Sequence, residues 1–140
     1  MKYGPVDVVV FASTEPKFDG SVLMELARLA QTGTIRVLDA MLLFKGEDGS
    51  ILRIDVEDLP DDNKAALAFI ETGTRGLFDS EDAEEFAEGM VPGAAVVALA
   101  IENAWAVGLI NAIEGVGAEI AMHTRIPAVI VDDALAALAE

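Results

Sequence analysis

Residues 6–12 read VDVVVFA, and residues 94–101 read AAVVALAI. Both runs are almost continuously apolar and contain many β-branched residues, which is typical of strands that are buried on both faces. Each run follows a proline, Pro5 or Pro92, and each leads into a helical pattern that ends at glycine. We therefore predict that these two runs are the central strands of one sheet.

The segments around the two runs repeat one layout, in which a buried strand is followed by a helix and then by a more mixed strand. The layout occurs over residues 5–45 and again over residues 93–125, where residues 118–125 form the mixed strand. Because such crossovers are right-handed, we expect both helices on one face of the sheet. Pairing the two central strands predicts an α+β fold that is a ferredoxin-like, duplicated βαβ sandwich, with a mixed sheet of about five strands.

Three further segments complete the predicted single domain of residues 1–140. Residues 51–56 alternate apolar and polar side chains after a turn that contains glycine, which predicts a half-exposed edge strand in a hairpin. Residues 60–90 are predicted to be an acidic helical insert, broken at residues 73–76. Residues 127–139 follow a strand-breaking proline and carry a helical apolar pattern, which predicts a C-terminal helix.

Composition narrows the class of protein. The chain has 140 residues, no cysteine and a formal net charge of −16. The absence of cysteine excludes disulfides and thiolate chemistry and is typical of a cytoplasmic protein. Nucleic acids and anionic lipids require a basic patch, which nine scattered Lys and Arg residues do not form. The first apolar run is too short to span a membrane, so we expect neither a nucleic-acid nor a membrane partner.

Much of the negative charge lies in one stretch. Residues 55–88 contain twelve acidic residues against Lys64 and Arg75, a net charge of −10. We interpret these carboxylates as solvated helix faces that keep the protein soluble, and the alternative is a docking surface for a basic protein. The carboxylates between residues 55 and 62 lack the residue order of a calcium loop, so we predict no metal site.

The predicted sheet is apolar on both faces. In the first strand Val8 and Val10 point to one face, while Val9 and Phe11 point to the other. An uncovered second face would expose several hundred Å² of apolar surface, on the order of the largest patch that a monomer tolerates. The acidic helices, the C-terminal helix or a second copy of the chain must cover it. We expect a homo-oligomer to supply at least part of this cover.

Four residues are candidates for a ligand-binding site. His123 is the single histidine, and alternation places it on the same strand face as Arg125, where the two could bind an anion. Glu102, Asn103 and Trp105 lie where the second central strand passes into its helix, a common place for ligands. The alternatives are a structural histidine, a helix cap at Asn103 and a buried Trp105. The predicted site comprises Glu102, Trp105, His123 and Arg125, without a cofactor.

Several short segments together resemble a known family. They are Gly4-Pro5-Val6-Asp7, Lys17-Phe18-Asp19-Gly20-Ser21 leading into Leu26-Ala27-Arg28-Leu29, Thr34-Ile35-Arg36-Val37-Leu38-Asp39, Glu102-Asn103-Ala104-Trp105-Ala106 and Arg125-Ile126-Pro127-Ala128. The chain resembles short acidic bacterial proteins, common in actinobacteria, that are known as a domain of unknown function. Relatives with an apolar middle segment are sometimes labelled membrane-associated, but residues 60–89 here are acidic. The resemblance implies no activity, cofactor or catalytic residue.

We interpret the chain as a non-enzymatic, self-associating cytoplasmic protein that acts as an assembly or interaction module. A link to stress rests on analogy alone. The alternative is a small-ligand-binding or enzymatic domain with a pocket near Glu102, Trp105, His123 and Arg125. No set of nucleophile, base and acid is evident, because one histidine would have to serve every such scheme.

Overall fold

The computed structural model has a mixed α+β fold built on one open antiparallel sheet. It describes residues 3–14, 21–55, 68, 70 and 77–139. Four strands pair in the order β1-β4-β2-β3, and every neighbouring pair is antiparallel. The strands are β1 (Val6–Ser13), β2 (Arg36–Lys45), β3 (Ile51–Asp55) and β4 (Ala95–Glu102).

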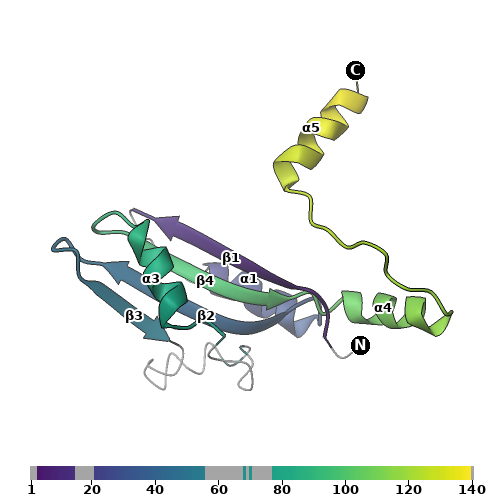
Figure 1. The fold of residues 1–140 in the computed structure, drawn as a ribbon, viewed down its shortest axis with the longest axis horizontal. Helices are drawn as coiled ribbons and strands as arrows, with labels where there is room; N and C mark the ends of the chain where they lie inside the picture. The colour runs from purple at the N-terminus through teal and green to yellow at the C-terminus, as the bar shows by residue number, and fades with distance from the viewer. Residues whose placement is uncertain (1–2, 15–20, 56–67, 69, 71–76, 140) are drawn as a thin grey trace.

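The described helices are distributed over both sides and one end of the sheet (Figure 1). Helix α1 lies on one face and α3 on the other, whereas α4 leads away from the end of β4 and α5 lies far from the sheet. The helices are α1 (Ser21–Gln31), α3 (Ser80–Glu88), α4 (Ala106–Gly115) and α5 (Ala128–Leu138). In the part of the chain that the structure describes, no helix is long and apolar enough to cross a membrane.

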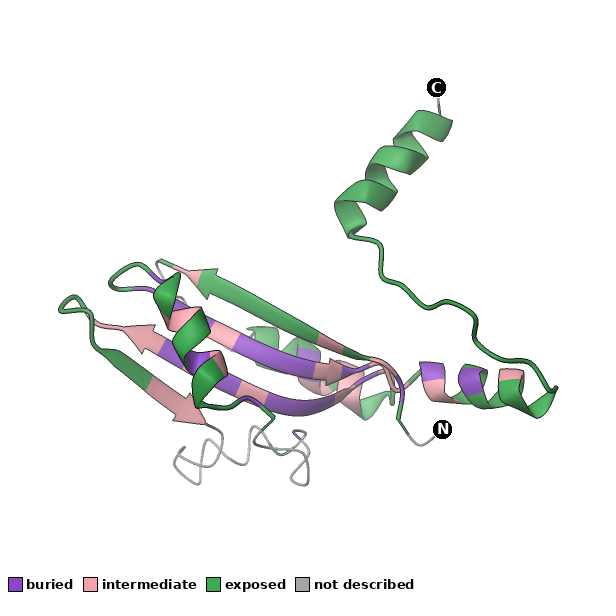
Figure 2. Ribbon diagram, viewed as in Figure 1, coloured by how far each residue is buried: buried purple, intermediate pink, exposed green. Residues whose placement is uncertain are grey.

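The core lies on both faces of β2 and β4 (Figure 2). On the α1 face, Leu26 packs in a cluster with Val37 and Leu99. On the α3 face, Leu43 and Phe78 belong to a second cluster, against which Phe86 and Ala87 pack. The acidic segment therefore supplies an apolar helix face to the sheet, and its carboxylates lie on the other side of that helix.

The hairpin prediction is confirmed. Strands β2 and β3 pair from Lys45↔Ile51 to Met41↔Asp55, and β3 is the edge strand next to β2. In the turn, Gly49 has φ +86°, a conformation that glycine adopts without the steric cost a Cβ would add. The Asp48 carboxylate accepts a hydrogen bond from the backbone N–H of Ser50, which stabilises the turn.

One of the two predicted central strands is an edge strand. Strand β4 lies between β1 and β2, as predicted for residues 94–101. Strand β1 pairs with β4 alone among the described strands, so the prediction that residues 6–12 are central is wrong. Its apolar side chains are exposed, in contrast to those of β4.

The fifth strand is the second correction. Residues 118–125, predicted to be a strand, form an exposed segment without regular secondary structure. The reason is the direction of α4, which continues beyond the sheet instead of turning back over it (Figure 1). The segment after α4 therefore does not reach the sheet in a strand-pairing position. Within the described residues the sheet has four strands and is antiparallel, not mixed with about five.

The predicted placement of helices is corrected for the same reason. Helix α1 packs on the sheet, but α4, the helix of the second repeat, does not lie beside it on that face. The C-terminal helix is confirmed as α5, with all its residues exposed. Most of the predicted helix starting near residue 60, and the break at residues 73–76, lie outside the described residues. Ile70, which is described, forms a parallel β-bridge with Val37 and is not helical, so the prediction is wrong at this position. Residues 80–88 form α3 as predicted.

Candidate functional site

Polar side chains gather at the end of the sheet where β4 passes into α4. Antiparallel pairing places Val6, Glu102 and Arg36 side by side across three strands. Alternation along β1 then puts the next residue, Asp7, on the opposite face of the sheet. The end of the sheet therefore carries two polar groups, one on each face.

The first group is a buried ion pair. Glu102 is fully buried, and its Oε1 accepts hydrogen bonds from Nε of Arg36 at 2.7 Å and lies 2.6 Å from Nη2. The ring of Tyr3 lies over the guanidinium, 4.9 Å from Cζ to the ring centroid, a cation–π contact. The second carboxylate oxygen of Glu102, Oε2, is buried and accepts no hydrogen bond from the described residues. Arg36 thus neutralises a carboxylate that water does not reach.

The second group is a chain of hydrogen bonds centred on Asn103. Its Nδ2 donates to the carboxylate of Asp7 at 2.9 Å and to the carbonyl of Pro5 at 3.1 Å. Its Oδ1 accepts a hydrogen bond from the indole N–H of Trp105 at 3.3 Å. Asn103 therefore ties the beginning of β1 to the end of β4.

Arg125 extends this chain from a distant part of the sequence. Its Nε donates to Asp7 at 2.9 Å, and its Nη2 makes a second contact with the same carboxylate. The hydrogen bond from Asn103 lowers the pKa of Asp7 below its ordinary value, and Arg125 and the charge of His123 lower that pKa further. Partial burial opposes these effects. Asp7 is thus held as a carboxylate facing two basic side chains.

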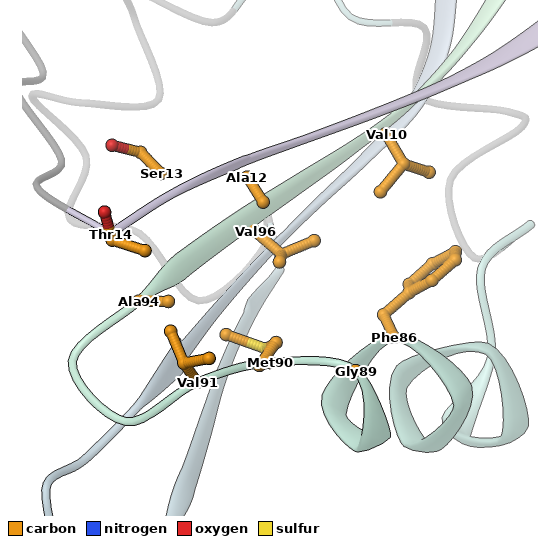
Figure 3. A pocket seen from close by; sticks show the side chains of 10 residues that line it. All are labelled: Val10, Ala12, Ser13, Thr14, Phe86, Gly89, Met90, Val91, Ala94 and Val96. Carbon is orange, nitrogen blue, oxygen red and sulfur yellow. The ribbon is translucent and has the colours of Figure 1, made fainter.

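A separate apolar groove of about 370 Å³ lies between α3 and the edge of the sheet (Figure 3). Val10 and Ala12 of β1 form one wall, and Phe86 and Met90 line the opposite side. Ser13 and Thr14 lie at one end of the groove. The groove is continuous with the exposed α3-side face of β1.

Comparison with known families identifies the chain. The model of a family of unknown function, DUF6325, matches residues 2–140. The chain belongs to the DUF6325 family. This confirms the resemblance to a domain of unknown function. No curated protein and no solved structure shows significant similarity to it.

The DUF6325 chain brings three of the four predicted site residues to one polar group. Trp105 and Arg125 are joined through Asn103 and Asp7, and His123 is near enough for its charge to act on Asp7. The fourth, Glu102, is paired with Arg36 on the other face. The groove in Figure 3 is lined by none of the four. Ligand binding by these residues stays a prediction.

The structure also tests the two structural alternatives, a helix cap at Asn103 and a buried Trp105. Asn103 does not cap α4 with its side chain, because that side chain bonds to Pro5 and Asp7 instead. Trp105 is 58% exposed and does not lie in a buried helix stripe. Both residues join the strand end to the N-terminal segment.

Sequence reasoning missed Asp7, Arg36 and Tyr3. Asp7 carried a signal, since it is the single charged residue in an apolar strand of the DUF6325 chain. Arg36 and Tyr3 carried none, because their role depends on which residue the neighbouring strand places beside them. Within the described ranges, no three His, Asp or Glu side chains gather as metal ligands would.

Proposed function

We propose that this DUF6325 protein is a self-associating, non-enzymatic assembly or interaction module of the cytoplasm. The observation that carries the proposal is the exposure of apolar side chains on β1. Val8, on the α3 side, is 60% exposed, and Val9 and Phe11 are exposed on the other side. Apolar surface of this kind on both faces of one strand marks an interaction site.

The C-terminal segment supports the same proposal. Helix α5 has an apolar surface that is wholly exposed, with Leu138 at 81% exposure and Val129 at 65%. Helix α5 contains no glycine, but an isolated helix of 11 residues is marginal in water. Contact with another surface would stabilise it.

Native mass tests the proposal. Sedimentation at micromolar concentration is expected to give at least twice the chain mass of 14.7 kDa. The variant Val8→Lys/Val10→Lys places charges on the exposed face and is expected to reduce this mass. Val22→Lys, at a similarly exposed position on α1, is the matched control and should leave the mass unchanged. A monomeric wild-type protein would overturn the proposal.

A small-ligand site is a second candidate, favoured by one observation. The exposed indole of Trp105 and the exposed guanidinium of Arg125 flank the Asn103–Asp7 pair, so both an aromatic and an anionic group could bind there. Native mass spectrometry of the purified protein tests this candidate. His123→Ala should release any bound small molecule with little change in melting temperature, and loss of stability instead would favour a structural histidine.

A basic protein is a further candidate partner. Helix α3 exposes Glu81, Glu84, Glu85 and Glu88 on the side away from the sheet. Such a surface attracts cationic partners, and its attraction weakens with salt. Replacing these four residues by Gln should weaken binding of a polylysine probe at low ionic strength without changing native mass.

A further inference from the structure

The chain has an open sheet edge and, elsewhere, an extended segment without a described strand partner. Strand β1 ends the sheet, and no described strand lies beside its outer edge. Residues 118–125 are extended and exposed, with an alternating pattern but no strand partner. An open sheet edge is a template for pairing with another chain. An added strand is also a common mode of protein association.

We propose that residues 118–125 of a second copy add to the outer edge of β1 as an antiparallel fifth strand, with Arg125 opposite Asp7. The proposal rests on the self-association proposed above and names the segments that mediate it. It gives each subunit the five-stranded, ferredoxin-like sheet that the repeat predicts, with the fifth strand supplied by the partner. The pair exchanges equivalent segments about a two-fold axis.

The contact between Arg125 and Asp7 sets the register. Within one chain these two side chains already form an ion pair, so their chemistry is matched. If Arg125 lies opposite Asp7 in an antiparallel pair, Met122 lies opposite Val10, three strand positions further in from the end. In the proposed dimer, Arg125 of the second copy takes the position beside Asp7 that Arg125 of the same chain occupies here.

This register brings like side chains together on each face. Val10 and Ala12 would face Met122 and Ile120, all on the α3 side, where they extend the wall of the apolar groove in Figure 3. The polar residues Arg125 and His123 would fall on the other side, with Asp7. A slip of one residue would exchange the two faces, and Met122 would then lie with Asp7. The alternation in both segments therefore favours the register that the ion pair indicates.

The direction of α4 selects a second copy over the same chain. Its first turn is buried at Ala106, and the N–H of Trp105 donates to the carbonyl of Thr34 at 3.2 Å, which holds α4 pointing away from the sheet (Figure 1). Antiparallel pairing would require residue 118 to lie beside the far end of β1. That position is about 40 Å from the end of α4, given the rises of helix and strand.

Only two residues connect α4 to the segment, and they span about 7 Å. The chain therefore cannot place residues 118–125 along its own β1 while α4 keeps this direction. A second copy has no such restriction. The outward direction of α4 carries the beginning of the segment away from its own β1, although Arg125 at its other end contacts Asp7 of the same chain. An approaching subunit can therefore receive the segment along its full length.

Disulfide trapping tests the proposal, because the native chain has no cysteine. The variant Val10→Cys/Met122→Cys changes two exposed positions, and an unchanged melting temperature under reducing conditions confirms that it folds. Opposite residues of an antiparallel pair are close enough for a disulfide. Mild oxidation is expected to give covalent dimers that reducing agent separates. The control Val10→Cys/Ala121→Cys places the second thiol on the opposite face and should cross-link at a small fraction of that yield.

The outcomes separate this proposal from self-association in general. Covalent dimers through residues 10 and 122 support strand exchange. A disulfide within one chain would show that the segment closes on its own β1 and would overturn the exchange. A dimeric mass without this cross-link would overturn the exchange but not self-association, and a monomeric mass would overturn both.

Discussion

Arg36 and Glu102 form an ion pair in which the carboxylate is completely buried and the guanidinium is only partly so. The two residues lie opposite each other in the β2–β4 pairing, so the sheet itself sets their distance. Removing one partner of such a pair leaves a buried charge without a counter-charge. The resulting loss of folding free energy is larger than the stabilisation that the pair itself contributes.

Arg36→Met is therefore expected to lower the free energy of unfolding by about 3 kcal/mol, measured by urea denaturation at pH 7. Arg36→Met/Glu102→Met removes both charges and should recover most of this loss. Arg28→Met, which breaks the exposed pair with Glu25, is the control and should hardly move the denaturation midpoint. A double variant as unstable as the single one would contradict the assignment.

The hydrogen bond from Asn103 to Asp7 makes stability depend on pH. Since the folded protein lowers the pKa of Asp7, this group stabilises the fold above its unfolded pKa of about 3.9, and the contribution disappears as pH falls through the folded pKa. Asn103→Ala should raise the pKa of Asp7 towards its ordinary value in an NMR titration. In this variant the free energy of unfolding should also decrease less as the pH is lowered below 5. An unchanged Asp7 titration would refute this role of Asn103.

Gly4 allows the N-terminal segment to approach the β4–α4 junction. A Cβ at this position would overlap the carbonyl oxygen of Asn103, a backbone atom that cannot move aside easily. We expect Gly4→Ala to destabilise the fold by about 1–3 kcal/mol. Gly108→Ala, in α4 with open space around it, should instead stabilise the protein by about 0.5–1 kcal/mol. Thermal denaturation of the two variants should therefore shift in opposite directions.

Helix α3 begins with a capping box. Asp79 accepts a hydrogen bond from the N–H of Asp82 at 2.9 Å, and the Asp82 carboxylate accepts one from the N–H of Asp79 at 2.9 Å. Asp79→Ala is expected to lower the free energy of unfolding by about 1 kcal/mol. Glu85→Ala, an exposed change in the same helix, should lower it far less. Equal effects in chemical denaturation would count against the cap.

The capping box of α3 is an example of a feature that local sequence is sufficient to predict. Helix α3 begins inside the predicted helical insert of residues 60–90, at the capping box of Asp79 and Asp82, and capping depends on neighbours in sequence. Likewise Gly33, with φ +74°, ends α1 as predicted, and Gly49 forms the predicted hairpin turn. These features are local, so the sequence pattern is sufficient to find them.

The candidate site required more than local pattern. The sequence pointed to Trp105 and Arg125, but it could not show that Asp7 lies between them, 118 residues from Arg125 along the chain. It also grouped Glu102 with them, although alternation at the end of β4 sends its side chain to the other face. Spatial neighbours across strands are decided by register, and register is a property of the whole sheet.

The sequence by itself determined the apolar strands, the capped helices, the acidic character of residues 55–88 and the excess of apolar surface on residues 6–12. Only the tertiary structure decided that β1 lies at an edge, that Arg36 neutralises Glu102 and that α4 leads away from the sheet. The physical reason is that periodicity and capping act over one or two turns of chain. Strand order and helix direction depend instead on which distant surfaces exclude water from each other.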